Sequence, residues 1–426
     1  MQFLSSTAKS RWSRVALILA LIGPGIITAN VDNDAGGIAT YSLAGGNYGL
    51  TTLWTMIPIG LFLFIVQEMS ARLGAITGKG LADLIRENFG LKLTFWVLLA
   101  VAVTNLANTM GEFAGIASGA EIFGVSRYLA VPLAALLVWW VIIKGSYKTV
   151  EKVFLGACLV YLAYPISGFM AKPNWAEMAQ AVVVPQWSHQ PGYVAMLIGI
   201  VGTTIAPWMQ FYQQAAVVDK GITAKDYKWT RLDVLVGCVF AVIVVFFIVA
   251  TCASTIYRLP AGADGLRVHE MKDAAHALFP LAGKYCAGLF AIGLLNASLF
   301  AASILPLATA YQLAEGIGWE RGLDRQFREA PEFYTIYTLL IVLGAGLVLL
   351  PRAPLLQIMY LSQVLNGLLL PVVLVLMLVL INRTRLMGRY TNSRLYNYIA
   401  WACVILVSGL GMWLGVTTLF PKLGGG

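Results

Sequence analysis

The chain has 426 residues, of which 59% are hydrophobic and 12% charged, and its formal net charge is +9. A soluble domain carries roughly 25–35% charged residues on its surface, so this composition excludes a soluble enzyme and a nucleic-acid-binding domain. The mean hydropathy of +0.77 also excludes a disordered chain and indicates a polytopic membrane protein.

Apolar stretches long enough to cross a bilayer as helices, which takes about 20 residues each, recur along the whole sequence. We therefore predict an all-α fold with eleven transmembrane helices in one domain covering residues 1–426. The expected spans are 15–45, 50–71, 94–121, 128–143, 150–171, 193–217, 232–257, 281–313, 333–350, 354–381 and 396–419.

The basic residues predict how these spans are oriented, because loops rich in Lys and Arg stay in the cytoplasm. With a cytoplasmic N-terminus, 21 of the 29 basic residues fall on the inside and 8 on the outside. The positive charge therefore indicates topology and requires no nucleic-acid partner. An odd number of spans then places the C-terminus outside the cell.

Spans 1 and 6 both contain helix-breaking residues beside polar ones. Span 1 has Gly and Pro around four polar residues between Asn30 and Asp34, and span 6 has Pro207 after Gly202 and Thr203. Interrupted segments at matching places in two halves are typical of a transporter with a binding site near the middle of the membrane. We predict inverted repeats of about 13–172 and 193–382, with 396–419 as an extra helix.

Three carboxylates fall inside the predicted spans, where each costs about 2.5 kcal/mol or more: Asp32, Asp34 and Glu112. Two further acids, Glu68 and Glu121, lie close enough to span ends to be interfacial. No Lys, Arg or His lies deep in a span. Acidic groups without basic partners favour a bound cation over a structural ion pair.

Amide side chains accompany these acids. Asn105 and Asn108 share one face of span 3 with Glu112, at spacings of three and seven residues, and span 10 contributes Gln363 and Asn366. Each amide alone is more typical of a hydrogen bond between helices than of a metal ligand. Together they form an all-oxygen ligand set, which hard cations such as Mg²⁺ prefer.

The two interrupted spans resemble those of the Nramp family of divalent-metal transporters. The segment Gly23-Pro24-Gly25 followed by Asp34 to Thr40 is similar to the family's first span, which reads Asp-Pro-Gly-Asn and then a Thr. Residues 202–215 resemble its sixth span, and 78–86 resemble the segment after its second. The resemblance implies a LeuT-type fold and suggests Asp34, the Thr203 carbonyl and Gln363 as ligands of the transported metal.

The departures from the family pattern are specific. The aspartate is retained as Asp34, but Gly37 replaces the asparagine, Ala206 the metal-binding methionine and Trp208 the histidine. The acidic pair that moves protons on span 3 is replaced by Asn105 and Asn108. This combination resembles the Nramp-related magnesium transporter branch, which carries Mg²⁺ and also Mn²⁺ without proton coupling.

We therefore expect uptake of Mg²⁺, and also Mn²⁺, through a hydrated site around Asp34, driven by the membrane potential across a bacterial inner membrane. The ion is the substrate, so neither a cofactor nor an obligate protein partner is expected. Two alternatives stay open: a proton-coupled Mn²⁺/Fe²⁺ transporter using Asp32 or Glu112 as relay, and a Na⁺-coupled amino-acid symporter. An enzyme is disfavoured, because no nucleophile is paired with a base.

Overall fold

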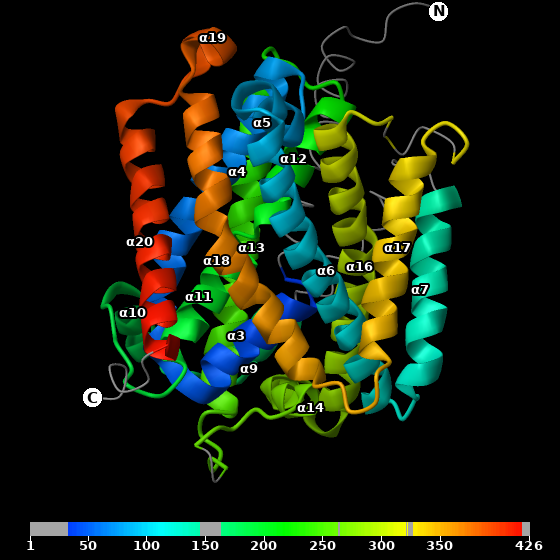
Figure 1. Ribbon diagram of the computed structural model, residues 1–426. Coiled ribbons are helices and arrows are strands. Elements are labelled where there is room, and N and C mark those ends of the chain that lie inside the picture. Colours follow the sequence, from blue (N-terminus) through cyan, green and yellow to red (C-terminus); the bar gives the residue numbers. More distant parts are fainter. Residues whose placement is uncertain (1–32, 145–162, 263–264, 321, 323–326, 420–426) are drawn as a thin grey trace, which may run out of the picture.

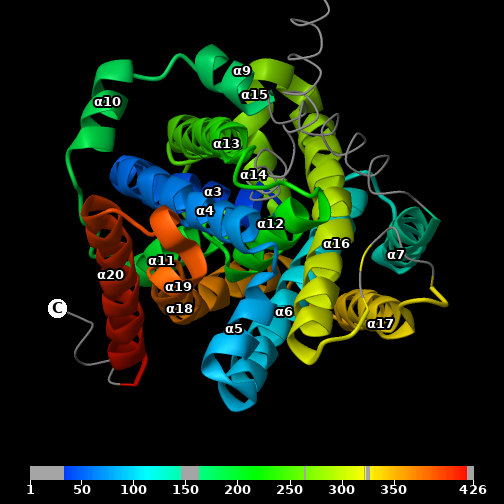
Figure 2. The same cartoon turned by 90° about the horizontal axis from the view of Figure 1, so that it is seen from above.

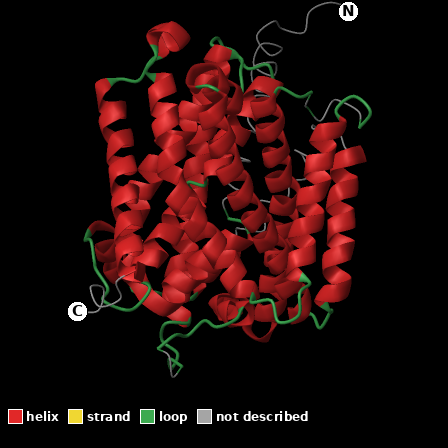
Figure 3. Cartoon of the chain, in the orientation of Figure 1, coloured by secondary structure: helices red, strands yellow, loops and turns green. Residues whose placement is uncertain are grey.

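Nearly all of the structure is helical, and no strand occurs among the residues it describes (Figure 3). The computed structural model describes residues 33–144, 163–262, 265–320, 322 and 327–419. The helices stand side by side in one bundle, with short helices and loops at both ends (Figure 1). A helical bundle satisfies backbone hydrogen bonds within each segment, as a bilayer requires.

The first group of helices precedes residue 145. It consists of α3 (Ala35–Tyr48), η1 (Gly49–Thr55), α4 (Met56–Thr77), α5 (Leu81–Phe89), α6 (Leu91–Ile122) and α7 (Arg127–Lys144). The next group consists of α9 (Ala163–Met170), α10 (Trp175–Val183), α11 (Tyr193–Thr204), α12 (Pro207–Asp219) and α13 (Tyr227–Thr255).

The last group starts with short helical turns: α14 (Met271–Ala274), η3 (Ala275–Leu278), α15 (Phe279–Ala282) and η4 (Gly283–Tyr285). It continues with α16 (Cys286–Ile317), α17 (Pro331–Val348), α18 (Leu355–Ile381), α19 (Thr384–Met387), η5 (Gly388–Tyr390) and α20 (Arg394–Leu419). Viewed along the bundle, α3, α4, α11 and α12 lie in its middle, with α10, α20 and α7 at the rim (Figure 2).

The described residues contain nine helical segments long and apolar enough to cross a membrane. Spans 1 and 2 join in one segment, Ala35–Thr77, because η1 links α3 directly to α4. Most of predicted span 1 and most of predicted span 5 lie outside the described residues. The count of eleven therefore stays a prediction, while the other nine predicted spans each coincide with an observed segment.

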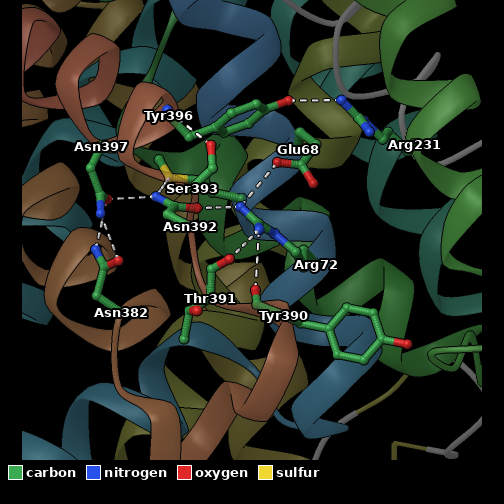
Figure 4. Close-up of polar contacts among 11 residues, drawn as sticks. Glu68, Arg72, Arg231, Asn382, Tyr390, Thr391, Asn392, Ser393, Tyr396 and Asn397 are labelled. Carbon is green, nitrogen blue, oxygen red and sulfur yellow. Dashed lines mark hydrogen bonds and ion pairs between the residues drawn. The ribbon is translucent and has the colours of Figure 1, made fainter.

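A buried ion pair lies in α4 where this helix passes the predicted end of span 2. This helix continues to Thr77, beyond the predicted end of span 2, so Arg72 lies within it, 7% exposed, and pairs with Glu68 at 3.2 Å. Glu68 is only 1% exposed, so its carboxylate is buried within the protein and paired with a cation. Arg72 also donates to the carbonyl of Tyr390 at 3.1 Å and to the side chain of Asn392 (Figure 4). The pair thus fastens α4 to the loop before α20.

Neighbouring polar contacts extend this fastening to two other helices (Figure 4). Arg231 of α13 donates to the hydroxyl of Tyr396 in α20 at 3.0 Å. Asn397 of α20 exchanges hydrogen bonds with Asn382, just after α18, at 2.8 and 2.9 Å. The end of the bundle carrying α19 is therefore held by side chains that link α20 to α13 and to the end of α18.

Removing Arg72 is expected to destabilise the fold strongly. The substitution Arg72→Met leaves the Glu68 carboxylate buried without its cation, which costs about 3–5 kcal/mol. The matched control is Lys79→Met, because Lys79 pairs with Glu87 at 2.7 Å while both side chains are exposed, and such pairs contribute about 1 kcal/mol or less. Thermal unfolding in detergent measures both variants. Equal unfolding temperatures for the two variants would contradict a structural role for the buried pair.

Candidate functional site

In the middle of the bundle, α11 ends and α12 begins. The segment Tyr193–Asp219 is interrupted at residues 205 and 206, where α11 ends and α12 begins. Pro207 is the first residue of α12, a position that tolerates proline because the first backbone N–H groups of a helix have no partner within it. Proline has no N–H to offer the carbonyl four residues earlier. That carbonyl belongs to Thr203, so the break predicted in span 6 is confirmed.

Asp34 stands at the start of another helix, α3. It is the N-cap of α3, where its Oδ1 accepts a hydrogen bond from the backbone N–H of Gly37 at 2.6 Å, and it is 4% exposed. An N-terminal helix end favours a negative charge through the free N–H groups and the helix dipole. The structure therefore gives Gly37 a backbone role in holding the Asp34 carboxylate.

The carboxyl group of Glu112 lies against that of Asp34. Glu112 is fully buried in α6 and accepts a hydrogen bond from the backbone N–H of Ala35 at 3.2 Å, while its second oxygen has no hydrogen-bond partner. Two carboxyl groups in contact away from water would repel strongly if both were ionised. A divalent cation beside them would compensate both charges.

Glycines allow the surrounding helices to approach these acids. A Cβ added to Gly36 would lie 1.9 Å from the Nε2 of Gln363, so the Gln363 side chain of α18 packs against α3 two residues from Asp34. A Cβ on Gly202 would lie 2.0 Å from the carbonyl oxygen of Gln363. Helices α3, α11 and α18 therefore converge at Gln363, as helices do where small residues face one another.

A chain of amides supports Gln363. Its Oε1 accepts from Asn366 at 2.9 Å, and Asn366 exchanges two hydrogen bonds of 3.0 Å with Asn108. Asn108 is thereby connected to the site through another amide. Asn105 instead donates to Thr309 of α16 at 2.8 Å, so the structure does not bring it to the site.

The remaining sequence-predicted residues lie at the break or outside the described region. Thr203 and Ala206 are each 2% exposed. The Thr203 hydroxyl has no hydrogen-bond partner, whereas the Ala206 carbonyl accepts from the backbone of Met209 at 3.1 Å. The prediction for Asp32 lies outside the described residues.

One residue was missed by the sequence prediction. Asn33 precedes Asp34, is fully buried, and neither polar atom of its side chain has a hydrogen-bond partner. Burying such an amide without a partner costs free energy, so it is suited to meet an ion or its water. Its place in the polar run Asn30 to Asp34 was the signal that could have identified it.

The chemistry of this assembly is that of oxygen ligands. Within the part of the chain that the structure describes, no three side chains of His, Cys, Asp and Glu gather into a metal cluster. A cation at this place would be bound by two carboxylates, amide oxygens and backbone carbonyls, together with water. Such a set suits hard divalent ions better than soft ones.

Comparison with known proteins gives a consistent result. The family model "Natural resistance-associated macrophage protein-like" (Nramp) matches residues 25–417. Among solved structures, an Eremococcus coleocola manganese transporter in complex with an aromatic bis-isothiourea substituted compound has a TM-score of 0.74 and 19% identity, covering 96% of this chain and 87% of its own. A histidine-to-alanine mutant of that transporter has a TM-score of 0.75 and 19% identity, and the match covers 98% of this chain and 89% of the transporter. At this identity the likeness concerns the fold.

Proposed function

The chain belongs to the Nramp family, whose members are metal ion transporters and not enzymes, and from this premise we propose that it imports Mg²⁺, and also Mn²⁺, without proton coupling. It is a multi-pass membrane protein that transports divalent metal ions. The ion specificity, the energy source, and the orientation in a plasma membrane with a cytoplasmic N-terminus belong to the proposal. So do the inverted repeats and alternating access.

The observation that supports Mg²⁺ is the oxygen-only character of the site at the α11–α12 break. Ala206 stands where the family has a metal-binding methionine, and an alanine side chain supplies no ligand. The carboxylates of Asp34 and Glu112 and the Gln363 amide are hard oxygen ligands. Mg²⁺ gives up its water reluctantly and binds through one or two carboxylates while retaining several waters. We place the ion, partly hydrated, beside Asp34.

The proposal of uncoupled uptake rests on the amides of α6. Asn105 and Asn108 cannot change charge, and their hydrogen bonds to Thr309 and Asn366 hold them as structural groups. The membrane potential can replace the proton gradient, since a divalent ion gains about 4.6 kcal/mol per 100 mV. That corresponds to more than about a thousandfold accumulation at equilibrium.

Ion flux in liposomes tests this proposal. Purified protein is reconstituted with a Mg²⁺ indicator or a pH-sensitive dye inside, and a K⁺ gradient with valinomycin sets the potential. We expect Mg²⁺ influx to accelerate at an inside-negative potential while the internal pH stays constant. Proton flux in fixed proportion to metal flux would overturn the uncoupled mechanism.

The contact between Glu112 and Asp34 favours one other function, a proton-coupled Mn²⁺/Fe²⁺ transporter. Glu112 is the titratable group beside Asp34 on α6, so it is the natural relay in this alternative. Proton flux in the wild type that disappears in Glu112→Gln while metal flux persists would establish it. No proton flux in either protein would support the uncoupled mechanism.

Introducing a sulfur ligand at the α11–α12 break is expected to change which metal ions the protein binds best. Ala206→Met adds a thioether at the α11–α12 break, and Cd²⁺ should then inhibit Mn²⁺ uptake at a concentration lower by about tenfold or more, because soft ions gain most from sulfur. Ala206→Leu is the matched control, similar in size but without sulfur. Competition assays measure both variants. Equal Cd²⁺ inhibition in the two would place Ala206 away from the ion.

A further inference from the structure

Two adjoining cavities lie at the rim of the bundle, away from the metal site. Both cavities are lined in part by α10, which stands outside α4 and α13 when the bundle is viewed along its axis (Figure 2). The larger cavity measures about 730 Å³ and is lined by apolar residues of α4, α10 and α13, among them Leu61, Ala179 and Val239. This volume is within the range of about 300–1,000 Å³ found for small-molecule sites.

The smaller cavity, of about 260 Å³, is polar. It lies at the end of the bundle where α13 finishes and η1 begins, and its lining includes Asn174, Glu177, Gln186 and Arg258. Met178 lines both cavities, so the apolar groove and the polar cavity are adjacent. An amphiphilic ligand with one polar end and one long apolar end fits a polar cavity next to an apolar groove.

The polar cavity carries both signs of charge. Glu177 and Arg258 are exposed, and within the described chain neither forms an ion pair. A guanidinium group binds phosphate through two parallel hydrogen bonds, and a carboxylate accepts hydrogen bonds from an ammonium group. A ligand carrying a phosphate and a primary ammonium group would satisfy both residues.

We propose that the two adjoining cavities bind a phospholipid with an ethanolamine headgroup. One acyl chain lies in the groove between α4, α10 and α13, the phosphate meets Arg258, and the ammonium group meets Glu177. Arg258 follows the end of the membrane-spanning α13, at the level where headgroups lie. This site is separate from the metal site and independent of which ion is carried.

The headgroup decides the preference among lipids. An acyl chain gains little by moving from the bilayer into an apolar groove, because lipid tails are as apolar as the groove. Phosphatidylcholine has no N–H to donate to Glu177, and phosphatidylglycerol has no cation to pair with it. Phosphatidylethanolamine should therefore be retained in preference to both.

Native mass spectrometry of the full chain in detergent tests the site. Equimolar dioleoyl phosphatidylethanolamine, phosphatidylcholine and phosphatidylglycerol are added to delipidated protein. We expect phosphatidylethanolamine to be retained about tenfold more than phosphatidylcholine, the factor for one charge-assisted hydrogen bond. Glu177→Gln should remove this preference, and Arg258→Gln should lower retention of all three lipids.

Two further variants separate the groove from general lipid coating. Ala179→Trp fills the apolar groove and should reduce phosphatidylethanolamine retention, whereas Lys284→Gln, at an exposed cation elsewhere on the surface, should not change it. Unfolding temperatures in lipid-free detergent confirm that each variant is folded. Equal retention of the three lipids by the wild type, or an Ala179→Trp variant that binds normally, would show surface lipid only and overturn the proposal.

Discussion

Asp34→Ala and Asp34→Asn are both expected to abolish metal uptake. The buried Asp34 carboxylate is the negative group at the start of α3, beside Glu112 and close to the Gln363 side chain. Removing one partner from a buried pair of opposite charges, here the carboxylate that faces the bound cation, costs about 3–5 kcal/mol, which corresponds to a loss of about a hundredfold or more in affinity. Mg²⁺ and Mn²⁺ uptake into liposomes measures the effect.

The two Asp34 variants should differ in stability. Asparagine is as good an N-cap as aspartate, whereas alanine loses the hydrogen bond from Gly37 and costs about 1 kcal/mol. A loss of uptake in both variants, with a lowered unfolding temperature only in Asp34→Ala, separates metal binding from folding. Glu121→Gln is the control, because Glu121 pairs with Arg127 at the exposed end of α6. Normal uptake by Asp34→Asn would remove Asp34 from the site.

Gly202→Ala is expected to be the most damaging small substitution. The added methyl group would lie 2.0 Å from the Gln363 carbonyl oxygen and 2.3 Å from the backbone nitrogen of Gly367. Both neighbours are backbone atoms and cannot rotate away, so α11 and α18 must separate, at a cost of about 1–3 kcal/mol. The separation also moves Thr203 away from Gln363, so uptake should fall together with the unfolding temperature.

Another helical glycine provides the control for this prediction. A Cβ on Gly346, in α17, meets nothing within 4 Å, so Gly346→Ala should be neutral or stabilising by up to about 1 kcal/mol, the difference in helix propensity. Heat-induced unfolding in detergent and Mn²⁺ uptake are measured for both variants. If Gly202→Ala behaved like Gly346→Ala, α11 and α18 would not be in close contact at the proposed metal site.

The breaks could be predicted because their cause is local. Pro207 cannot donate a backbone hydrogen bond wherever its helix packs, so the sequence alone shows that the carbonyl of Thr203 lacks its usual helical donor. The polar run before α3 likewise identified Asp34 as a carboxylate inside an apolar span, where a charged group is costly and needs a partner. Glu112 could also be anticipated, since a fully buried carboxylate in an apolar span requires a partner.

Whether the other polar residues belong to the site depended on the direction in which each side chain points from its helix and on which helix lies opposite. Asn105 and Asn108 are three residues apart, so their side chains point about 60° apart on a helix of 3.6 residues per turn. One therefore meets α16 and the other α18, a difference that no spacing rule reveals. The burial of Glu68 could not be predicted for the same reason, because it depends on Arg72 and on a loop more than 300 residues later.

By itself, the sequence determined that this is a helical membrane protein, the positions of nine described spans, and the interruption at Pro207. Hydropathy and backbone donors are properties of short segments, and a bilayer requires each segment to satisfy its own backbone. The tertiary structure decided which polar side chains share a site. It brought Glu112 to Asp34 and Gln363 to Gly36, because those contacts exist only once helices distant in the sequence have packed together.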